Sequence, residues 1–426
     1  MEITLHYGKK GLACSLPDNI VEKVLKTSGP KPLAKPEAAI RSALKKPYGS
    51  VEPLADAAKG AKSVCIVISD VTRPVPYPVL LPPLLETLEK DAKVARKNIS
   101  LLIATGLHRP NVGAELSAMV GKDIAANYTI LNHDARDAAS HVEVGITSRG
   151  THILVDKRYV DADLKIVTGL VEPHFMAGYS GGRKAICPGI SSAETIGKLH
   201  SAELLGSDGA ELGRIDGNPM HGEILEGALL ARVDYCVNVT VNAGRKITGV
   251  FAGDIQAAHL AACKAAEKAV SDYVDRPVDI VLTTGAGYPL DATFYQTVKG
   301  VVGAASIVKR GGTIIIASEC SEGMGSKEFI ALVRDFGSPD AFLNKILKSP
   351  GFVIDQWQLQ LLAKVLKKAE VLLVSTGVKP ADVAPLGIPV FADVQSALDA
   401  AISKHGKSAR IAVIPEGPYV LAQLRR

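Results

Sequence analysis

The sequence predicts an α/β protein of two domains, each built on a mostly parallel sheet flanked by helices. Short apolar, β-branched segments alternate with longer amphipathic segments along the whole chain. At 426 residues, the chain exceeds the size of one ordinary hydrophobic core. Its composition of 47% hydrophobic and 22% charged residues is typical of globular proteins.

Strands are expected where runs of Val, Ile and Leu are bounded by turn residues, and helices where apolar residues recur at helical spacing. The expected strands are Ser63–Ser69, Ile99–Ala104, Tyr128–Leu131, Leu164–Thr168, Tyr235–Val241, Asp279–Thr284, Thr313–Ala317, Val371–Ser375 and Arg410–Ile414. The expected helices include Leu80–Lys90, Ala193–Leu204, Gly222–Ala231, Ile255–Val274, Lys327–Phe336, Gln356–Lys368 and Val394–His405.

The boundary between the domains is expected just after the Ala-rich helix at Ile255–Val274. The next residues, Asp-Arg-Pro-Val-Asp, suit a charged linker in which Pro277 stops the helix. Residues 1–275 then form an N-terminal domain that carries most of the candidate site residues, and residues 276–426 form a C-terminal α/β domain. The segment Met1–Gly8 reads as a strand that could pair in either domain.

Composition and charge argue against several classes of protein. With 5% aromatic residues and a net charge of +5, the chain lacks the stacking rings and basic surface of a nucleic-acid-binding protein. The six cysteines include no Cys-x-x-Cys pair, which argues against a zinc ribbon or a disulfide framework. Because no export signal and no bilayer-spanning apolar run is visible, we expect a cytoplasmic protein without membrane partners.

Chemically active residues follow four of the expected strands. These groups are Asp70–Pro74, Gly106–Pro110, Glu172–Lys184 and Tyr295–Gly300. In open α/β sheets, ligands bind beyond the carboxyl ends of the strands. Since three groups belong to the first domain and one to the second, the sequence predicts an active site in a cleft between the domains.

The loop that ends at Lys184 is the most informative segment. Gly178, Gly181 and Gly182 leave backbone N–H groups uncovered, so the loop could close around an anion such as phosphate, and Arg183 adds positive charge. The segment matches neither the Walker A pattern nor the dinucleotide Gly-x-Gly-x-x-Gly pattern. Plain phosphate binding is therefore the default role of Lys184, and a nucleophilic amine that forms a covalent link is the alternative.

Three histidines lie near these groups. His108 and His174 each sit beside a proline in a strand-end loop, and together they could act as an opposed acid and base. Either one alone would more simply be a loop histidine bonded to the backbone. His200, on an expected helix, could be a metal ligand or an ordinary surface or interdomain histidine.

Several further residues could recognise a substrate. Asp70 and Arg73 are three apart in a turn, where each could be a structural charge, but the planar guanidinium of Arg73 also suits two-point recognition of a carboxylate. Gln296 and Lys299 share one side of a short helical segment by their spacing and could complete such a clamp. Trp357, the only tryptophan, favours a packing role over a catalytic one.

Taken together, these motifs resemble the lactate racemase family, whose enzymes use a nickel-pincer nucleotide. The resemblance covers nearly the whole chain in order and spacing, and its most specific part is the segment Gly178-Tyr-Ser-Gly-Gly-Arg-Lys184. The residues that carry it are Asp70, Arg73, His108, Glu172, His174, Lys184, His200, Tyr295, Gln296 and Lys299.

The resemblance implies a role for each candidate residue. The cofactor would be a pyridinium mononucleotide with two sulfur-containing arms that hold nickel, joined to Lys184 through a thioamide, with His200 as the protein ligand of the metal. His108 and His174 would be the catalytic acid/base pair. The remaining cofactor-site residues would be Asp70, which orders the site, and Gly178, Ser180, Gly181 and Gly182, which hold the phosphate. The substrate-binding residues would be Arg73, Gln296, Lys299, Tyr295 and Trp357.

The resemblance also implies the reaction, which is racemisation or epimerisation of a 2-hydroxy acid by reversible hydride transfer. Lactate is the first choice of substrate, and malate, a hydroxyglutarate, a longer aliphatic acid or a sugar acid remain open. Proteins of cofactor biosynthesis are the other implied partners, and the sequence does not predict an oligomeric state.

Two other functions are compatible with parts of the pattern. A metal-dependent hydrolase could use His108, His174 and His200 as a three-histidine site, although it would leave Lys184 and the glycine loop without a role. A nucleotide-binding sensor without catalysis would use the loop but neither of the paired histidines.

Overall fold

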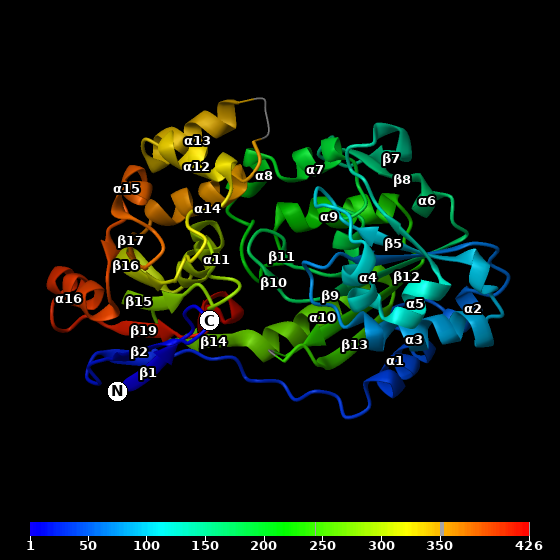
Figure 1. Ribbon diagram of the computed structural model, residues 1–426, viewed down its shortest axis with the longest axis horizontal. Coiled ribbons are helices and arrows are strands. Elements are labelled where there is room, and N and C mark those ends of the chain that lie inside the picture. The colour runs from blue at the N-terminus through cyan, green and yellow to red at the C-terminus, as the bar shows by residue number, and fades with distance from the viewer. Residues whose placement is uncertain (243, 350–352, 426) are drawn as a thin grey trace. The chain divides into compact units, whose positions relative to one another are not determined.

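The computed structural model describes residues 1–242, 244–349 and 353–425, and the chain divides into two compact units (Figure 1). The first unit contains residues 29–204 and 208–269, and the second contains residues 1–28, 205–207 and 270–426. This division differs from the expected boundary after residue 275, because the first 28 residues and the segment from 270 onward both belong to the second unit.

The first unit is built on a six-stranded sheet in the order β13-β12-β9-β4-β5-β6, in which only β13 is antiparallel to its neighbour. Its strands are β4 (Val64–Ser69), β5 (Ile99–Ala104), β6 (Thr129–Asn132), β9 (Leu164–Leu170), β12 (Tyr235–Val241) and β13 (Ile247–Gly253). The central strands are buried along almost their whole length, as expected for parallel strands covered on both faces.

The second unit has a six-stranded, wholly parallel sheet in the order β18-β17-β16-β15-β19-β3. Its strands are β3 (Val21–Val24), β15 (Val278–Thr284), β16 (Val308–Ala317), β17 (Glu370–Val374), β18 (Val390–Phe391) and β19 (Ile411–Ile414). On one face, alternate strand residues pack on apolar residues of α16, and α11 contacts β15 and β16. The α/β class and the mostly parallel sheets are thus confirmed.

Helices connect the strands of both units (Figure 1). Residues 29–270 contain α1 (Pro36–Lys45), α2 (Leu54–Ala57), α3 (Tyr77–Glu86), α4 (Gly113–Val120), α5 (Lys122–Asn127), α6 (Lys157–Val160), α7 (Ala193–Leu199), α8 (Ala202–Gly206), α9 (Pro219–Leu230) and α10 (Ile255–Val270). The C-terminal part contains α11 (Phe294–Ala304), α12 (Lys327–Arg334), α13 (Pro339–Lys348), α14 (Gln356–Leu366), α15 (Pro380–Val383) and α16 (Val394–His405). None of the described helices is long and apolar enough to cross a membrane.

Several expected elements begin or end a few residues away from their expected bounds, and three differ in type, continuity or pairing. The helix expected to reach Val274 ends at Val270, and the next residues form the strand β14 (Ser271–Val274), which pairs with β20 (Leu421–Leu424). Lys23 holds this extended segment in place, because its amine donates to the Asp272 carboxylate and to the Tyr273 carbonyl. The segment expected as one helix from Ala193 breaks at His200 into α7 and α8. The N-terminal strand pairs with neither large sheet, because β1 (Glu2–Leu5) forms a hairpin with β2 (Leu12–Ser15).

The strand order places a topological switch point between β4 and β9 in the first unit and between β15 and β19 in the second. From β4 the chain moves outward through β5 and β6, and the later strands β9, β12 and β13 extend the sheet on the other side. Ligands of open parallel sheets bind beyond the carboxyl ends of the strands at such points. In the first unit, this edge carries the residues that follow Ser69, Ala104 and Leu170.

Candidate active site

Asp70 and His108 form a close pair at the carboxyl edge of the first sheet. Asp70 follows β4, His108 lies in the loop after β5, and the His108 Nδ1 atom lies 2.6 Å from Asp70 Oδ2. The Asp70 side chain is 4% exposed, whereas that of His108 is 57% exposed. With Nδ1–H donated to the carboxylate, Nε2 is the ring nitrogen left to exchange a proton with a substrate.

Asp70 is held by its own turn. Thr72 Oγ1 donates to Asp70 Oδ1 at 2.7 Å, and the Arg73 N–H donates to the Asp70 carbonyl at 3.1 Å. Arg73 Nη1 lies 3.9 Å from Glu172 Oε1, and both side chains are about two-fifths exposed. Because an exposed pair at that distance is weak, the guanidinium keeps donors with which it can recognise a carboxylate.

His174 and Lys184 form a second close pair in the loop after β9. The two residues are joined by a 3.3 Å contact between Lys184 Nζ and His174 Nε2. The other ring nitrogen, Nδ1, accepts the backbone N–H groups of Met176 at 3.3 Å and Ala177 at 3.2 Å. Since an accepting Nδ1 carries no proton, the neutral ring carries its proton on Nε2, which faces the lysine.

The surroundings of Lys184 favour a neutral amine. Burial is the largest effect that holds the pKa of Lys184 well below its usual range, and the positive charges of Arg73 and Arg183 lower this pKa further. A neutral amine has a lone pair, so it can accept the Nε2–H of His174 and can act as a nucleophile. Of the two roles considered for Lys184, the structure therefore favours the nucleophilic amine over a fixed phosphate-binding charge.

The glycine loop packs closely against the rest of the protein. The N–H of Gly182 donates to Asn238 Oδ1 at 2.9 Å, and a Cβ on Gly178 or Gly181 would lie 2.0 Å from Arg214 O or 2.4 Å from Val171 Cγ2. All three glycines have positive φ angles. They therefore permit a tight turn and close packing, in which the Gly182 N–H bonds within the protein.

Ser180 and Arg183 also serve the loop itself. The buried Ser180 hydroxyl donates to Leu170 O at 2.7 Å and accepts the Glu172 N–H at 3.1 Å, so it closes the loop onto the end of β9. Arg183 places positive charge near Lys184, as expected, but it does so from within the core, where it is fully buried. Its Nη2 donates to the carbonyls of Ala177 at 3.0 Å and Tyr179 at 3.1 Å.

The side chain that contacts Arg183 within the core is His259, for which the sequence predicts no role. Arg183 Nη1 lies 2.6 Å from His259 Nε2, and the same ring nitrogen lies 2.9 Å from Ser180 O. Burial lowers the pKa of Arg183 to about 10. Burial also holds the pKa of His259 well below its usual range, which favours the uncharged ring beside the guanidinium. The sequence carries no signal for this contact, because His259 lies in the Ala-rich helix α10.

His200 follows α7 and has the features of a neutral, metal-binding imidazole. Its Nδ1–H donates to Ile196 O at 2.9 Å, which leaves Nε2 as the unprotonated ring nitrogen. Burial is the largest effect that lowers the pKa of His200 to about 4. A metal ion therefore would not have to displace a proton from this ring at neutral pH.

A protein-only metal centre is not supported. Among the residues that the structure describes, no three His, Cys, Asp or Glu side chains lie close enough together to hold a metal ion. His108 Nδ1 is bonded to Asp70, and His174 Nδ1 accepts two N–H groups. The three-histidine hydrolase site considered from the sequence is therefore not formed.

The second unit contributes a separate cluster at the start of α11. The indole Nε1–H of Trp357 donates to the Tyr295 hydroxyl at 3.1 Å, and Gln358 Nε2 donates to Tyr295 O at 2.7 Å. Gln296 and Lys299 are three residues apart on the same helix, and both are partly exposed. Gln358, which no sequence signal singled out, thus fixes the position of Tyr295 together with Trp357.

Comparisons with known proteins give one consistent result. Residues 7–213 match the family model described as the lactate racemase N-terminal domain, and residues 274–422 match the lactate racemase C-terminal domain. The curated lactate racemase of Thermoanaerobacterium thermosaccharolyticum is 36% identical over 99% of both chains, and that of Lactiplantibacillus plantarum is 36% identical over 91% of both.

The solved structures agree with the sequence matches. The lactate racemase apoprotein of T. thermosaccharolyticum superposes with a TM-score of 0.93 at 35% identity and covers 99% of this chain and 100% of its own. A Thermotoga maritima protein with a TM-score of 0.67 and 18% identity, covering 92% of this chain and 99% of its own, shares the fold.

Proposed function

This chain belongs to the lactate racemase family, a family of isomerases, and we propose that it interconverts the stereoisomers of a small 2-hydroxy acid. Lactate is the first candidate, because it is the substrate in the names of both curated relatives. The observation that carries the proposal is the arrangement of two histidines, one held by the Asp70 carboxylate and one beside the Lys184 amine.

The family's nickel-pincer nucleotide fits the residues of the first unit. Lys184 would hold it covalently through its neutral amine, and His200 would bind the metal through Nε2, since Nδ1–H donates to Ile196 O. When bound, this group supplies a hydride acceptor and donor for the carbon that bears the hydroxyl. The glycine loop also supports the proposal, because Gly178, Ser180, Gly181 and Gly182 shape the turn that presents Lys184.

His108 and His174 are proposed to exchange the hydroxyl proton of the substrate. His108 Nε2 takes this proton from one stereoisomer, and the buried Asp70 carboxylate stabilises the imidazolium that results. His174 is proposed to serve the other stereoisomer, and it can accept the hydroxyl proton at Nε2 once the proton that Nε2 carries beside Lys184 has been released to solvent. Two histidines are needed because the two stereoisomers present their hydroxyls on opposite sides, and each contributes about 10²–10⁴-fold to the rate.

Substrate recognition is proposed for residues of both units. Arg73 retains guanidinium donors that suit the substrate carboxylate. From the family resemblance, Lys299 and Gln296 of the second unit are proposed as further substrate-binding residues, together with Tyr295 and Trp357. The mutual hydrogen bond between Tyr295 and Trp357 supports this assignment, because it fixes two large side chains in one orientation.

Protein produced in a host that makes the cofactor tests the proposal. Its intact mass is expected to exceed that of the bare chain, metal analysis is expected to find about one nickel per chain, and a chiral assay is expected to show racemisation of lactate or of another acid in a panel. The panel contains malate, 2-hydroxyglutarate, longer aliphatic acids and sugar acids. A chain that carries nickel and the added mass but racemises no member of the panel would contradict the proposed function.

A further inference from the structure

Asn111 is a buried asparagine that joins the segments following three neighbouring strands of the first unit. Its side-chain Oδ1 accepts the N–H of Val71, just after β4, at 3.1 Å. Its backbone N–H donates to Asn132 Oδ1 at 2.8 Å, and its carbonyl accepts from Asn132 Nδ2 at 3.0 Å. Asn132 ends β6, and Asn111 itself lies in the loop after β5. The Asn111 side chain therefore links this loop to the segment after β4, and the Asn132 side chain links the same loop to the end of β6.

These contacts reach both members of the Asp70–His108 pair. Val71 directly follows Asp70, and His108 lies three residues before Asn111 on the same loop. The His108 ring is more than half exposed, so packing does not fix its position. The Asn111 contacts therefore hold the two segments whose separation sets the 2.6 Å hydrogen bond between Asp70 and His108.

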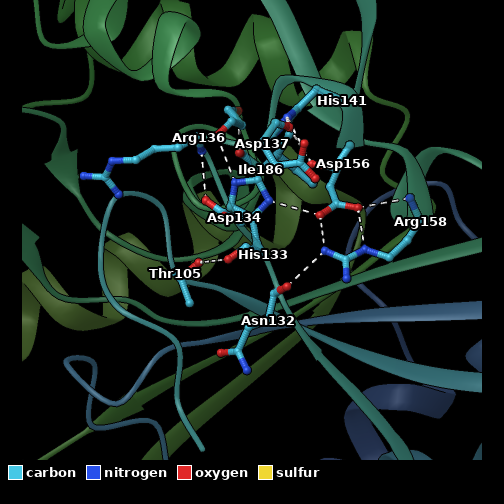
Figure 2. A network of polar contacts seen from close by, with 12 residues as sticks. Thr105, Asn132, His133, Asp134, Arg136, Asp137, His141, Asp156, Arg158 and Ile186 are labelled. Carbon is cyan, nitrogen blue, oxygen red and sulfur yellow. Dashed lines mark hydrogen bonds and ion pairs between the residues drawn. The ribbon is translucent and has the colours of Figure 1, made fainter.

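Asn132 is in turn fixed by an ionic network in which Asp156 and His133 are buried and Arg158 is partly exposed (Figure 2). Arg158 Nη2 donates to Asn132 O at 3.0 Å, and the same guanidinium binds both oxygens of the fully buried Asp156 carboxylate. His133 Nδ1 lies 3.0 Å from Asp156 Oδ2. Burial alone would raise the pKa of Asp156, but hydrogen bonds from Arg158 and His133 hold this pKa well below its usual range, so the Asp156 carboxylate remains ionised.

The same network reaches the His108 loop by a second route. Thr105 Oγ1 donates to His133 O at 2.7 Å, and the His108 N–H donates to Thr105 O at 2.9 Å (Figure 2 shows the first of these contacts). The His108 loop is thus tied to the network both before and after the histidine. None of Asn111, Asn132 or Asp156 touches the reacting groups, so their effect on the reaction is indirect.

We propose that Asn111 is a positioning residue for the Asp70–His108 pair, held through Asn132 by the ionic network of Asp156, His133 and Arg158. The catalytic part of this inference rests on the proposed function, in which His108 moves the hydroxyl proton. The geometric part of the inference is independent of the proposed function, because it concerns only the hydrogen bond between Asp70 and His108. Since a misplacement of about 1 Å can reduce a rate by about 10²-fold, loss of this link is expected to lower kcat rather than to raise KM.

A crystal structure of the cofactor-free Asn111→Ala variant tests the geometric part. We expect Asp70 Oδ2 and His108 Nδ1 to separate beyond hydrogen-bonding distance, whereas the exposed control Asn127→Ala keeps the pair intact. An unchanged pair in Asn111→Ala would overturn the inference. If this variant does not fold, Asn132→Ala removes the partner of Asn111 and is also expected to separate Asp70 Oδ2 from His108 Nδ1. An unchanged Asp70–His108 pair in Asn132→Ala would likewise overturn the inference.

A double-mutant cycle on the cofactor-loaded enzyme tests the catalytic part. Asn111→Ala is expected to lower kcat about 10–100-fold in the otherwise unchanged chain. In the Asp70→Asn background, the same substitution is expected to cost less than about threefold, because the pair that Asn111 positions is already altered. Equal losses in both backgrounds would show a merely structural role. If the unchanged enzyme racemises nothing, the proposed function fails while the crystal structures still decide the positioning role.

Discussion

Lys184 Nζ lies 3.3 Å from Nε2 of His174, whose other ring nitrogen accepts two backbone N–H groups. This arrangement sets the direction of the contact, because the neutral imidazole carries its proton on Nε2 and only an uncharged amine can accept it. Burial and the charges of Arg73 and Arg183 favour that uncharged amine. The loop thus presents a nucleophile beside a proton-transfer group.

Lys184 is expected to react with an amine-directed acylating reagent at a lower pH than an ordinary lysine. Its pKa is lowered in the folded protein, so it loses its proton earlier as the pH rises. Labelling of the cofactor-free protein, followed by peptide mass mapping, compares Lys184 with the exposed Lys59 as an internal reference. The labelling ratio of Lys184 to Lys59 is expected to increase as the pH falls from about 9 to about 7. A ratio that stays constant or falls would show a charged lysine.

Lys184→Ala is expected to abolish retention of the cofactor, because the variant lacks the amine through which the proposed covalent link forms. Intact mass after denaturation provides the measurement, since only a covalent adduct survives it. Lys198→Ala removes an exposed lysine from α7 and is expected to keep the full adduct. An adduct of unchanged mass in Lys184→Ala would place the attachment elsewhere.

Asp70→Asn is expected to lower kcat of the loaded enzyme by about 10²–10⁴-fold. The amide cannot stabilise an imidazolium at His108 as the carboxylate does, and its NH₂ group can turn the ring toward the wrong tautomer. The exposed Asp91→Asn is the matched control and is expected to keep the rate. Retention of near-normal kcat by Asp70→Asn would remove the carboxylate from the mechanism.

Arg183→Gln is expected to destabilise the first unit by about 1–3 kcal/mol in the free energy of unfolding. The shorter side chain cannot reach both the carbonyls of Ala177 and Tyr179 and the ring of His259, so buried polar groups lose their partners. Urea unfolding measures the change, and the exposed Arg149→Gln serves as the control. Equal unfolding midpoints for Arg183→Gln and the unchanged protein would show that the buried guanidinium does not stabilise the loop.

The positions of the site residues along the chain could be predicted because strand periodicity marks the carboxyl ends of the strands. β5 and β12 begin and end at the expected residues, and Asp70 follows its strand as expected. The direction of neighbouring side chains could not be predicted in the same way. Arg183 and Lys184 are adjacent in sequence, yet one points into the core and the other toward His174.

The role of the glycines also depended on information that the sequence does not contain. A positive φ angle at Gly178 suits many kinds of turn, and only the fold shows that Arg214 O lies where a Cβ at this position would be. Asn111 and His259 carry no motif at all. Their partners, Val71 and Arg183, lie 40 and 76 residues away, so the contacts arise from the fold.

The central claim is that hydrogen leaves the chiral carbon as hydride and returns to the same carbon, while His108 and His174 exchange only the hydroxyl proton. Racemisation of 2-deuterated lactate by the loaded enzyme in ordinary water, followed by mass spectrometry of the separated enantiomers, tests it most directly. We predict that both enantiomers retain deuterium at the chiral carbon. Replacement of that deuterium by hydrogen from the solvent at the rate of racemisation would show proton abstraction and contradict the account.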